Sequence, residues 1–145
     1  MNQIMVVYWS QTGNTEVMAN AVADGVREAG RECTVADVSS VSPDILKSAA
    51  VFALGCPAMG AEVLEESEME PFMEEVDAFA GGKQIGLFGS YGWGDGQWMR
   101  DWEERVQTAG GSVVGGQGVI ANEAPDDEAL AGCRELGKQL AALSA

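Results

Sequence analysis

Apolar and polar positions alternate along the chain in blocks that predict five strands, each followed by a helix. Continuous apolar runs are typical of parallel strands buried on both faces, and they occur at 4–9, 33–38, 50–55, 84–89 and 112–121. Helical spacing or a helix-capping residue predicts helices at 17–29, from Ser42, at about 67–80, at about 97–109, and from Pro125 to about Leu143. Gly115 and Gly116 interrupt the fifth strand pattern.

Five strand–helix units predict an α/β fold, with a parallel sheet and helices on both faces. The 145 residues suit one domain. We find neither an internal repeat nor a composition shift that would mark a linker. The chain is therefore expected to form a single domain over residues 1–145.

The charge balance excludes several classes of function. Asp and Glu number 23 against 8 Lys and Arg, which gives a formal net charge of −15. That charge disfavours nucleic acid and anionic membranes, and it suits a cationic partner surface, although solubility alone also explains an acidic coat. The chain has no histidine. This excludes Ser-His or Cys-His catalysis and His-ligated metal.

Cysteine usage and the apolar runs bear on the location. Cys33, Cys56 and Cys133 are odd in number and form no CxxC pair, so neither a disulfide framework nor a thiolate zinc site is expected. The longest apolar stretch, 49–61, contains Pro57 and is too short to span a bilayer. The first four residues lack the positive charge of a secretory signal. We expect a soluble cytoplasmic protein without a metal.

The loop after the first strand has the composition of a phosphate site. Ligands bind parallel sheets at the carboxyl ends of strands, near the point where strand order reverses. This loop carries hydroxyls, amides and a glycine before a helix: Ser10, Gln11, Thr12, Gly13, Asn14 and Thr15. No Lys or Arg precedes Arg27, so neutral donors alone would hold a phosphate at the helix N-terminus, unlike in a P-loop NTPase. Ordinary helix capping is the alternative.

The loops after the third and fourth strands could hold a flat ring. In 56–62, Met59 could cover an aromatic ligand and Gly60 lets the backbone approach it, although a surface turn is also compatible. In 90–96, Trp93 stands between glycines and is expected to stack on a ligand or to fold back on its own loop. Together the three loops suit a ligand with a phosphate at one end and a planar ring at the other.

Three segments resemble a family, the flavodoxins, and specifically the short-chain type of Clostridium-like anaerobic bacteria: 8–16, 54–60 and 87–94. The resemblance runs over essentially the whole chain. It implies a flavodoxin-like α/β fold with a five-stranded parallel sheet and helices on both faces. It also implies that residues 1–145 form one domain that binds FMN non-covalently and transfers single electrons.

The resemblance also assigns roles to residues. Ser10, Thr12, Asn14 and Thr15 would hold the FMN phosphate, with the N–H groups of Gln11 and Gly13. Met59 would cover the inner face of the isoalloxazine ring and Trp93 its outer face. Glu62 would accept a hydrogen bond from N3–H, and the Gly60 carbonyl would turn toward N5. The remaining residues implied at the cofactor are Pro57, Ala58, Ala61, Ser90, Tyr91, Gly92, Gly94 and Asn122.

Two positions depart from the family pattern. Gln11 stands where many relatives have glycine in the phosphate loop, and Ala61 stands where relatives often have Asp, Asn, Ser or Gly. If position 61 requires a positive φ, Ala costs about 1 kcal/mol there, which would alter the stability of the semiquinone.

The implied function is that of a low-potential one-electron carrier, not an enzyme with its own substrate. It would shuttle between semiquinone and hydroquinone and serve cytosolic redox enzymes. Eight of the sixteen residues in 62–77 are acidic, so basic docking surfaces on ferredoxin-type donors and acceptors are expected, although a solvated helix face explains part of this charge. Nothing indicates oligomerisation, so a monomer is expected.

Two other classes remain open on the residues alone. A flavin-dependent NAD(P)H:quinone reductase could use the same fold, but the chain offers no insertion for a nicotinamide and no basic cluster for its phosphate. A receiver domain without cofactor would need an acidic pocket after the first strand, where Ser10, Gln11 and Thr12 stand instead.

Overall fold

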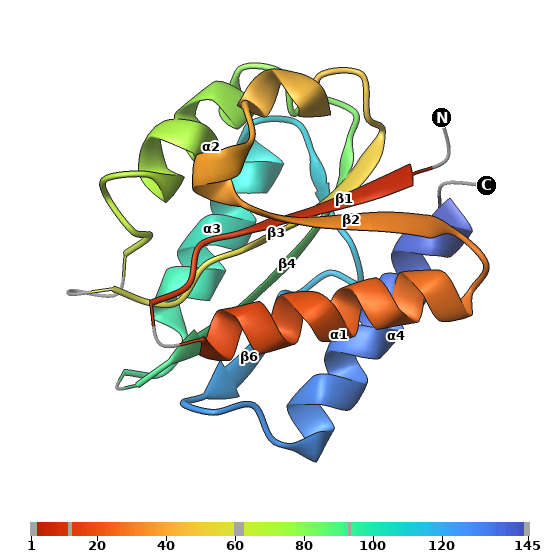
Figure 1. Cartoon of the computed structure of the whole chain (residues 1–145). Coiled ribbons are helices and arrows are strands. Elements are labelled where there is room, and N and C mark those ends of the chain that lie inside the picture. Colours follow the sequence, from red (N-terminus) through yellow and green to blue (C-terminus); the bar gives the residue numbers. More distant parts are fainter. Residues whose placement is uncertain (1–2, 12, 60–62, 93, 144–145) are drawn as a thin grey trace.

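The computed structural model describes residues 3–11, 13–59, 63–92 and 94–143. Its parallel sheet has the order β2-β1-β3-β4-β5, and β6 also pairs with β4 (Figure 1). The strands are β1 (Gln3–Tyr8), β2 (Glu32–Asp37), β3 (Val51–Gly55), β4 (Gln84–Tyr91), β5 (Ser112–Val113) and β6 (Val119–Asn122). The α/β prediction is confirmed, and strand order reverses between β1 and β3.

The predicted fifth strand is two short strands that pair with successive parts of β4. Ser112 and Val113 pair with Gln84 and Ile85, whereas β6 pairs with the carboxyl half of β4. Gly115 and Gly116 between them have φ values of 77° and 82°, a region that side-chain-bearing residues avoid. The glycine pair therefore breaks the strand, as its position in the pattern indicated, and pairing resumes through Asn122 rather than ending at Ala121.

In the described ranges, four α-helices follow strands: α1 (Asn14–Glu28), α2 (Met69–Asp77), α3 (Gln97–Thr108) and α4 (Asp127–Leu143). The helix expected from Ser42 is only a 3-10 turn, Pro43–Leu46, which Ser42 caps by accepting from the Asp44 N–H. Lys83 donates to the Lys47 and Ala49 carbonyls at 2.7 and 2.6 Å. These bonds tie down the chain beyond the turn, where an α-helix would need those carbonyls for itself.

Two buried cores lie on opposite faces of the sheet. Helices α1 and α4 cover one face, and α2 and α3 cover the other (Figure 1). Gly25 of α1 and Gly137 of α4 let these two helices approach closely, since a Cβ on Gly137 would lie 2.1 Å from the Val22 carbonyl oxygen of α1. Within the described part of the chain, no helix is both long and apolar enough to cross a membrane.

The three cysteines are buried and unpaired. Burial raises the pKa of Cys33 to about 11, and those of Cys56 and Cys133 to about 12. A thiol with so high a pKa is almost entirely protonated near neutral pH and is a poor nucleophile. The expectation that the cysteines form no disulfide framework agrees with this packing.

Candidate functional site

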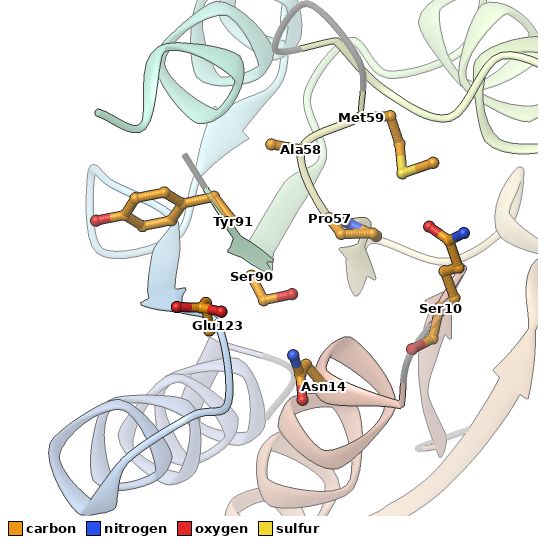
Figure 2. A pocket seen from close by; sticks show the side chains of 10 residues that line it. Ser10, Asn14, Pro57, Ala58, Met59, Ser90, Tyr91 and Glu123 are labelled. Carbon is orange, nitrogen blue, oxygen red and sulfur yellow. The ribbon is translucent and has the colours of Figure 1, made fainter. Parts of the chain in front are cut away.

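A pocket opens where β1, β3 and β4 end, at the edge where strand order reverses. Ten residues line it: Ser10, Gln11, Asn14, Pro57, Ala58, Met59, Ser90, Tyr91, Gly92 and Glu123. Figure 2 shows Ser10 and Asn14 on the side of α1, the segment 57–59 across from them, and Ser90, Tyr91 and Glu123 on a third side. Nine of these residues come from the three predicted loops.

Four other predicted site residues are described but do not line the pocket. Gly13 caps α1 with a φ of 97°, and Gly94 has a φ of 88°. The Thr15 hydroxyl is buried and lies 3.2 Å from the Ser90 hydroxyl. Asn122 lies at the end of β6, where its side-chain amide donates to the Tyr91 carbonyl. Five more predicted residues lie outside the described residues: Thr12, Gly60, Ala61, Glu62 and Trp93.

The α1 side of the pocket offers hydrogen-bond donors without a cation. The Ser10 hydroxyl oxygen accepts from the backbone N–H of Gly13 at 3.1 Å and of Glu16 at 3.3 Å. Among the described residues, nothing accepts from the backbone N–H groups of Asn14 and Thr15. Unpaired N–H groups at the positive end of a 15-residue helix suit an anion.

The second side continues the sheet beyond the last residue of β3. The Cys56 N–H donates to the Phe88 carbonyl at 3.1 Å, and the Ala58 N–H donates to the Ser90 carbonyl at 2.9 Å. Met59 then pairs with Val63 through two backbone hydrogen bonds of 2.9 and 3.0 Å. Pro57, Ala58 and Met59 thus form an apolar wall on a backbone that is anchored at both ends.

Trp98, which does not line the pocket, supports its third side. Tyr91 packs against Trp98 of α3, with ring centroids 5.6 Å apart. The buried Trp98 indole N–H donates to the Cys56 carbonyl at 3.1 Å. The tyrosine side and the apolar wall therefore share one support.

Glu123 is a lining residue that the sequence analysis missed. Its N–H donates to the Tyr91 carbonyl at 2.7 Å, and its φ of 57° is unusual for a residue other than glycine. Asn122 was expected near the cofactor only from the resemblance, and the next residue, Glu123, lines the pocket instead. The available signal was the loop after the fifth strand, because β6 pairs with the end of β4 and brings that loop to the same edge.

The lining residues suit FMN better than a reacting substrate. FMN needs a phosphate cradle and apolar cover for its ring, and the unpaired N–H groups and the 57–59 wall offer both at two sides of one pocket. Among the described residues, neither the Ser10 nor the Ser90 hydroxyl bonds a carboxylate, and the described lining holds no Lys or Arg. No group of three or more potential metal ligands exists among the described residues.

A doubly wound parallel sheet with such a pocket at its reversal point is typical of nucleotide-binding α/β proteins. The family model described as flavodoxin matches residues 6–137. A flavodoxin of Clostridium beijerinckii is 52% identical over 136 residues, which cover 94% of this chain and 97% of that protein. A flavodoxin of Megasphaera elsdenii is 44% identical over 138 residues, with 95% and 98% covered.

A solved structure agrees with these sequence relatives. The solution structure of two-electron reduced Megasphaera elsdenii flavodoxin has a TM-score of 0.87 at 43% identity, with 96% of this chain and 98% of that chain covered. The chain belongs to the flavodoxin family, whose members are FMN-binding electron carriers and not enzymes that turn over a substrate. The prediction of an FMN electron carrier is confirmed, and the NAD(P)H:quinone reductase alternative is disfavoured.

Proposed function

We propose that residues 1–145 act as one FMN domain and carry single electrons at low potential between redox enzymes. The observation that carries this proposal is one pocket with an apolar wall on one side and, across from it, helix N–H groups that have no acceptor among the described residues. Bound FMN supplies the electron chemistry, and the chain supplies binding, orientation and the local electric field.

The cradle at α1 would hold the phosphate. We assign this role to Ser10, Asn14 and the backbone N–H groups of Gln11 and Thr15. The resemblance also implies the Gly13 N–H, which in this structure donates to the Ser10 oxygen. The Ser10 oxygen, by accepting two backbone N–H groups, holds the loop in the shape that leaves the N–H groups of Asn14 and Thr15 available. We propose that Thr12 also holds the phosphate. The absence of Lys or Arg among the described lining residues leaves the phosphate charge uncompensated by any cation there.

The remaining site residues would hold the ribityl chain and the ring. Pro57, Ala58 and Met59 would cover one ring face, and Ser90, Tyr91 and Gly92 would border the chain and the ring edge. We keep Gly60, Ala61, Glu62, Trp93, Gly94 and Asn122 as proposed neighbours of the cofactor, with the roles that the resemblance implies. Glu123 joins them because it lines the same pocket.

The acidity of the chain supports a low potential. A net charge of −15 and a carboxylate in the lining both disfavour adding negative charge to the pocket. Bound FMN would therefore accept a further electron less readily than free FMN does. The three buried, protonated thiols are compatible with our proposal of a reducing, cytoplasmic location.

We propose that the partners are redox enzymes with basic docking surfaces. We also propose that this chain is a monomer. The acidic residues around α2 divide into two groups. Glu65 is buried, and Glu70 and Asp77 both bond Arg105 of α3 at 2.9 and 2.7 Å. Among the described residues of this segment, the exposed carboxylates that remain for a partner are Glu66, Glu74 and Glu75, whereas exposed Glu68 accepts from the Trp9 indole N–H at 3.0 Å.

A comparison of FMN with riboflavin tests the phosphate cradle. Ser10→Ala removes the oxygen that shapes the loop, and we expect it to weaken FMN binding by about tenfold, the equivalent of ~1.4 kcal/mol, with riboflavin binding unchanged. Quenching of flavin fluorescence measures both affinities. Ser40→Ala is the control, because Ser40 does not line the pocket and its hydroxyl also bonds the backbone, by donating to the Asp37 carbonyl. Equal losses for FMN and riboflavin would contradict the assignment.

A further inference from the structure

Trp98 lies outside the pocket, yet it contacts two of its sides. Its side chain is 1% exposed and belongs to the first turn of α3. The indole N–H donates to the carbonyl of Cys56, the residue that precedes the apolar wall. The same ring packs against Tyr91, at 5.6 Å between centroids and with 46° between the planes.

The Cys56 carbonyl reaches the indole only because position 89 is glycine. A Cβ on Gly89 would lie 2.1 Å from the Cys56 oxygen and 3.2 Å from Cζ2 of Trp98. Cys56 is fully buried, so its carbonyl depends on a protein donor. Its backbone N–H bonds Phe88, and its sulphur accepts from the Glu65 N–H at 3.4 Å. Cys56 is thus held by β4, by α3 and by the segment that leads to α2.

We propose that Trp98 is a positioning residue for the cofactor: through the Cys56 carbonyl and the Tyr91 ring, it holds two sides of the pocket at the spacing that FMN requires. This inference rests on the proposed function. Without the indole donor, the buried carbonyl would move to find another partner, and Pro57, Ala58 and Met59 would move with it. Binding FMN would then require that the wall be ordered first, which lowers affinity.

Trp98→Phe and Trp102→Phe form a matched pair. Trp102 is on the same helix, is also 1% exposed, and also donates one buried hydrogen bond, to the Met73 sulphur at 3.4 Å. Met73 belongs to α2, and neither Met73 nor Trp102 lines the pocket. Each variant therefore loses an indole and one hydrogen bond, and only Trp98→Phe loses the tie to the Cys56 carbonyl.

Two readouts are used. The first is the dissociation constant of FMN, measured from the fluorescence of FMN released when each holoprotein is diluted. The second is the visible spectrum of the bound flavin. We expect Trp98→Phe to raise the dissociation constant about tenfold and to shift the spectrum, and Trp102→Phe to change affinity less than about twofold. Urea denaturation of both variants shows whether their losses of stability match. Equal FMN affinities and spectra in the two variants would overturn the inference.

A second measurement needs no variant and serves if Trp98→Phe fails to fold. Linkage requires that FMN stabilise any bond that helps to bind it. Hydrogen exchange of the Trp98 indole N–H should therefore slow more on adding FMN than exchange of the Trp102 indole N–H. Equal slowing would overturn the inference while leaving FMN binding intact. Failure of the wild-type protein to bind FMN would instead overturn the proposed function, and this inference with it.

Discussion

Glu65 shows how one buried carboxylate organises the approach to α2. Its side chain accepts hydrogen bonds from the backbone N–H groups of Ser67, Glu68 and Met69, and from the Ser67 hydroxyl. Burial alone would raise the pKa of Glu65, but these hydrogen bonds outweigh it and lower the pKa below its ordinary value of 4.5. The ionised form of Glu65 is therefore stabilised in the folded protein.

We expect Glu65→Gln to destabilise the protein at pH 7 by about 1.5–3 kcal/mol, because a neutral amide replaces a charged acceptor. Since the folded pKa of Glu65 is lowered, its contribution is fully present above about pH 4.5 and is lost as pH falls through the folded pKa. Urea denaturation between pH 3 and 7 measures the difference in unfolding free energy between the wild-type protein and Glu65→Gln, with exposed Glu66→Gln as the control. A difference that stayed constant with pH would contradict the assignment.

The close contact between helices α1 and α4 depends on glycine at position 137. Sites 132 and 137 both lie within α4, but a Cβ at 137 would overlap the Val22 carbonyl oxygen at 2.1 Å, and a Cβ at 132 would meet Val119 at an ordinary 3.4 Å. Alanine favours a helix over glycine by about 1 kcal/mol. The two sites therefore offer the same substitution with opposite packing consequences.

We expect Gly137→Ala to destabilise the fold by about 1–3 kcal/mol, since the helices must move apart. Gly132→Ala should stabilise it by about 0.5–1 kcal/mol through helix propensity alone. The midpoint of urea denaturation decides between them. If both variants gained stability, the close approach of the helices at Gly137 would be wrong.

The strands and helices could be predicted because each buries an apolar face, and the period of that face is visible in the sequence. The site could be predicted in large part for a related reason: the carboxyl ends of successive parallel strands converge, which brings Ser10, Met59 and Ser90 together. What the pattern did not contain were tertiary partners. The pairing of β6 with the carboxyl half of β4 extends the strand through Asn122, and Lys83 holds the chain beyond the 3-10 turn. Trp98 reads as an ordinary core residue of a helix until its donor is seen to meet Cys56.

Charge acts at the scale of the whole molecule, through the faces on which it gathers. Glu74 and Glu75 are exposed on α2, while Asp24 and Glu28 are exposed on α1, across the sheet. Attraction between exposed charges steers association and is screened by salt. If partners approach the α2 side, only charges on that side should control the rate.

With a cationic haem protein as electron acceptor, we expect Glu74→Gln/Glu75→Gln to slow second-order electron transfer several-fold at low salt and to weaken its salt dependence. Asp24→Asn/Glu28→Gln removes the same charge from the α1 face and should have a smaller effect. Stopped-flow kinetics at several ionic strengths measures both. A rate that did not fall with salt, or equal effects of the two pairs, would contradict docking at α2.

The proposed function requires that the pocket between α1 and the 57–59 wall hold FMN and that the bound FMN pass one electron at a time. An anaerobic reductive titration of the holoprotein, followed by visible absorbance, tests it most directly. We expect two separate phases, each consuming one electron per FMN, with the second at the lower potential. A single phase that consumed two electrons together, or a protein that retained no FMN, would contradict it.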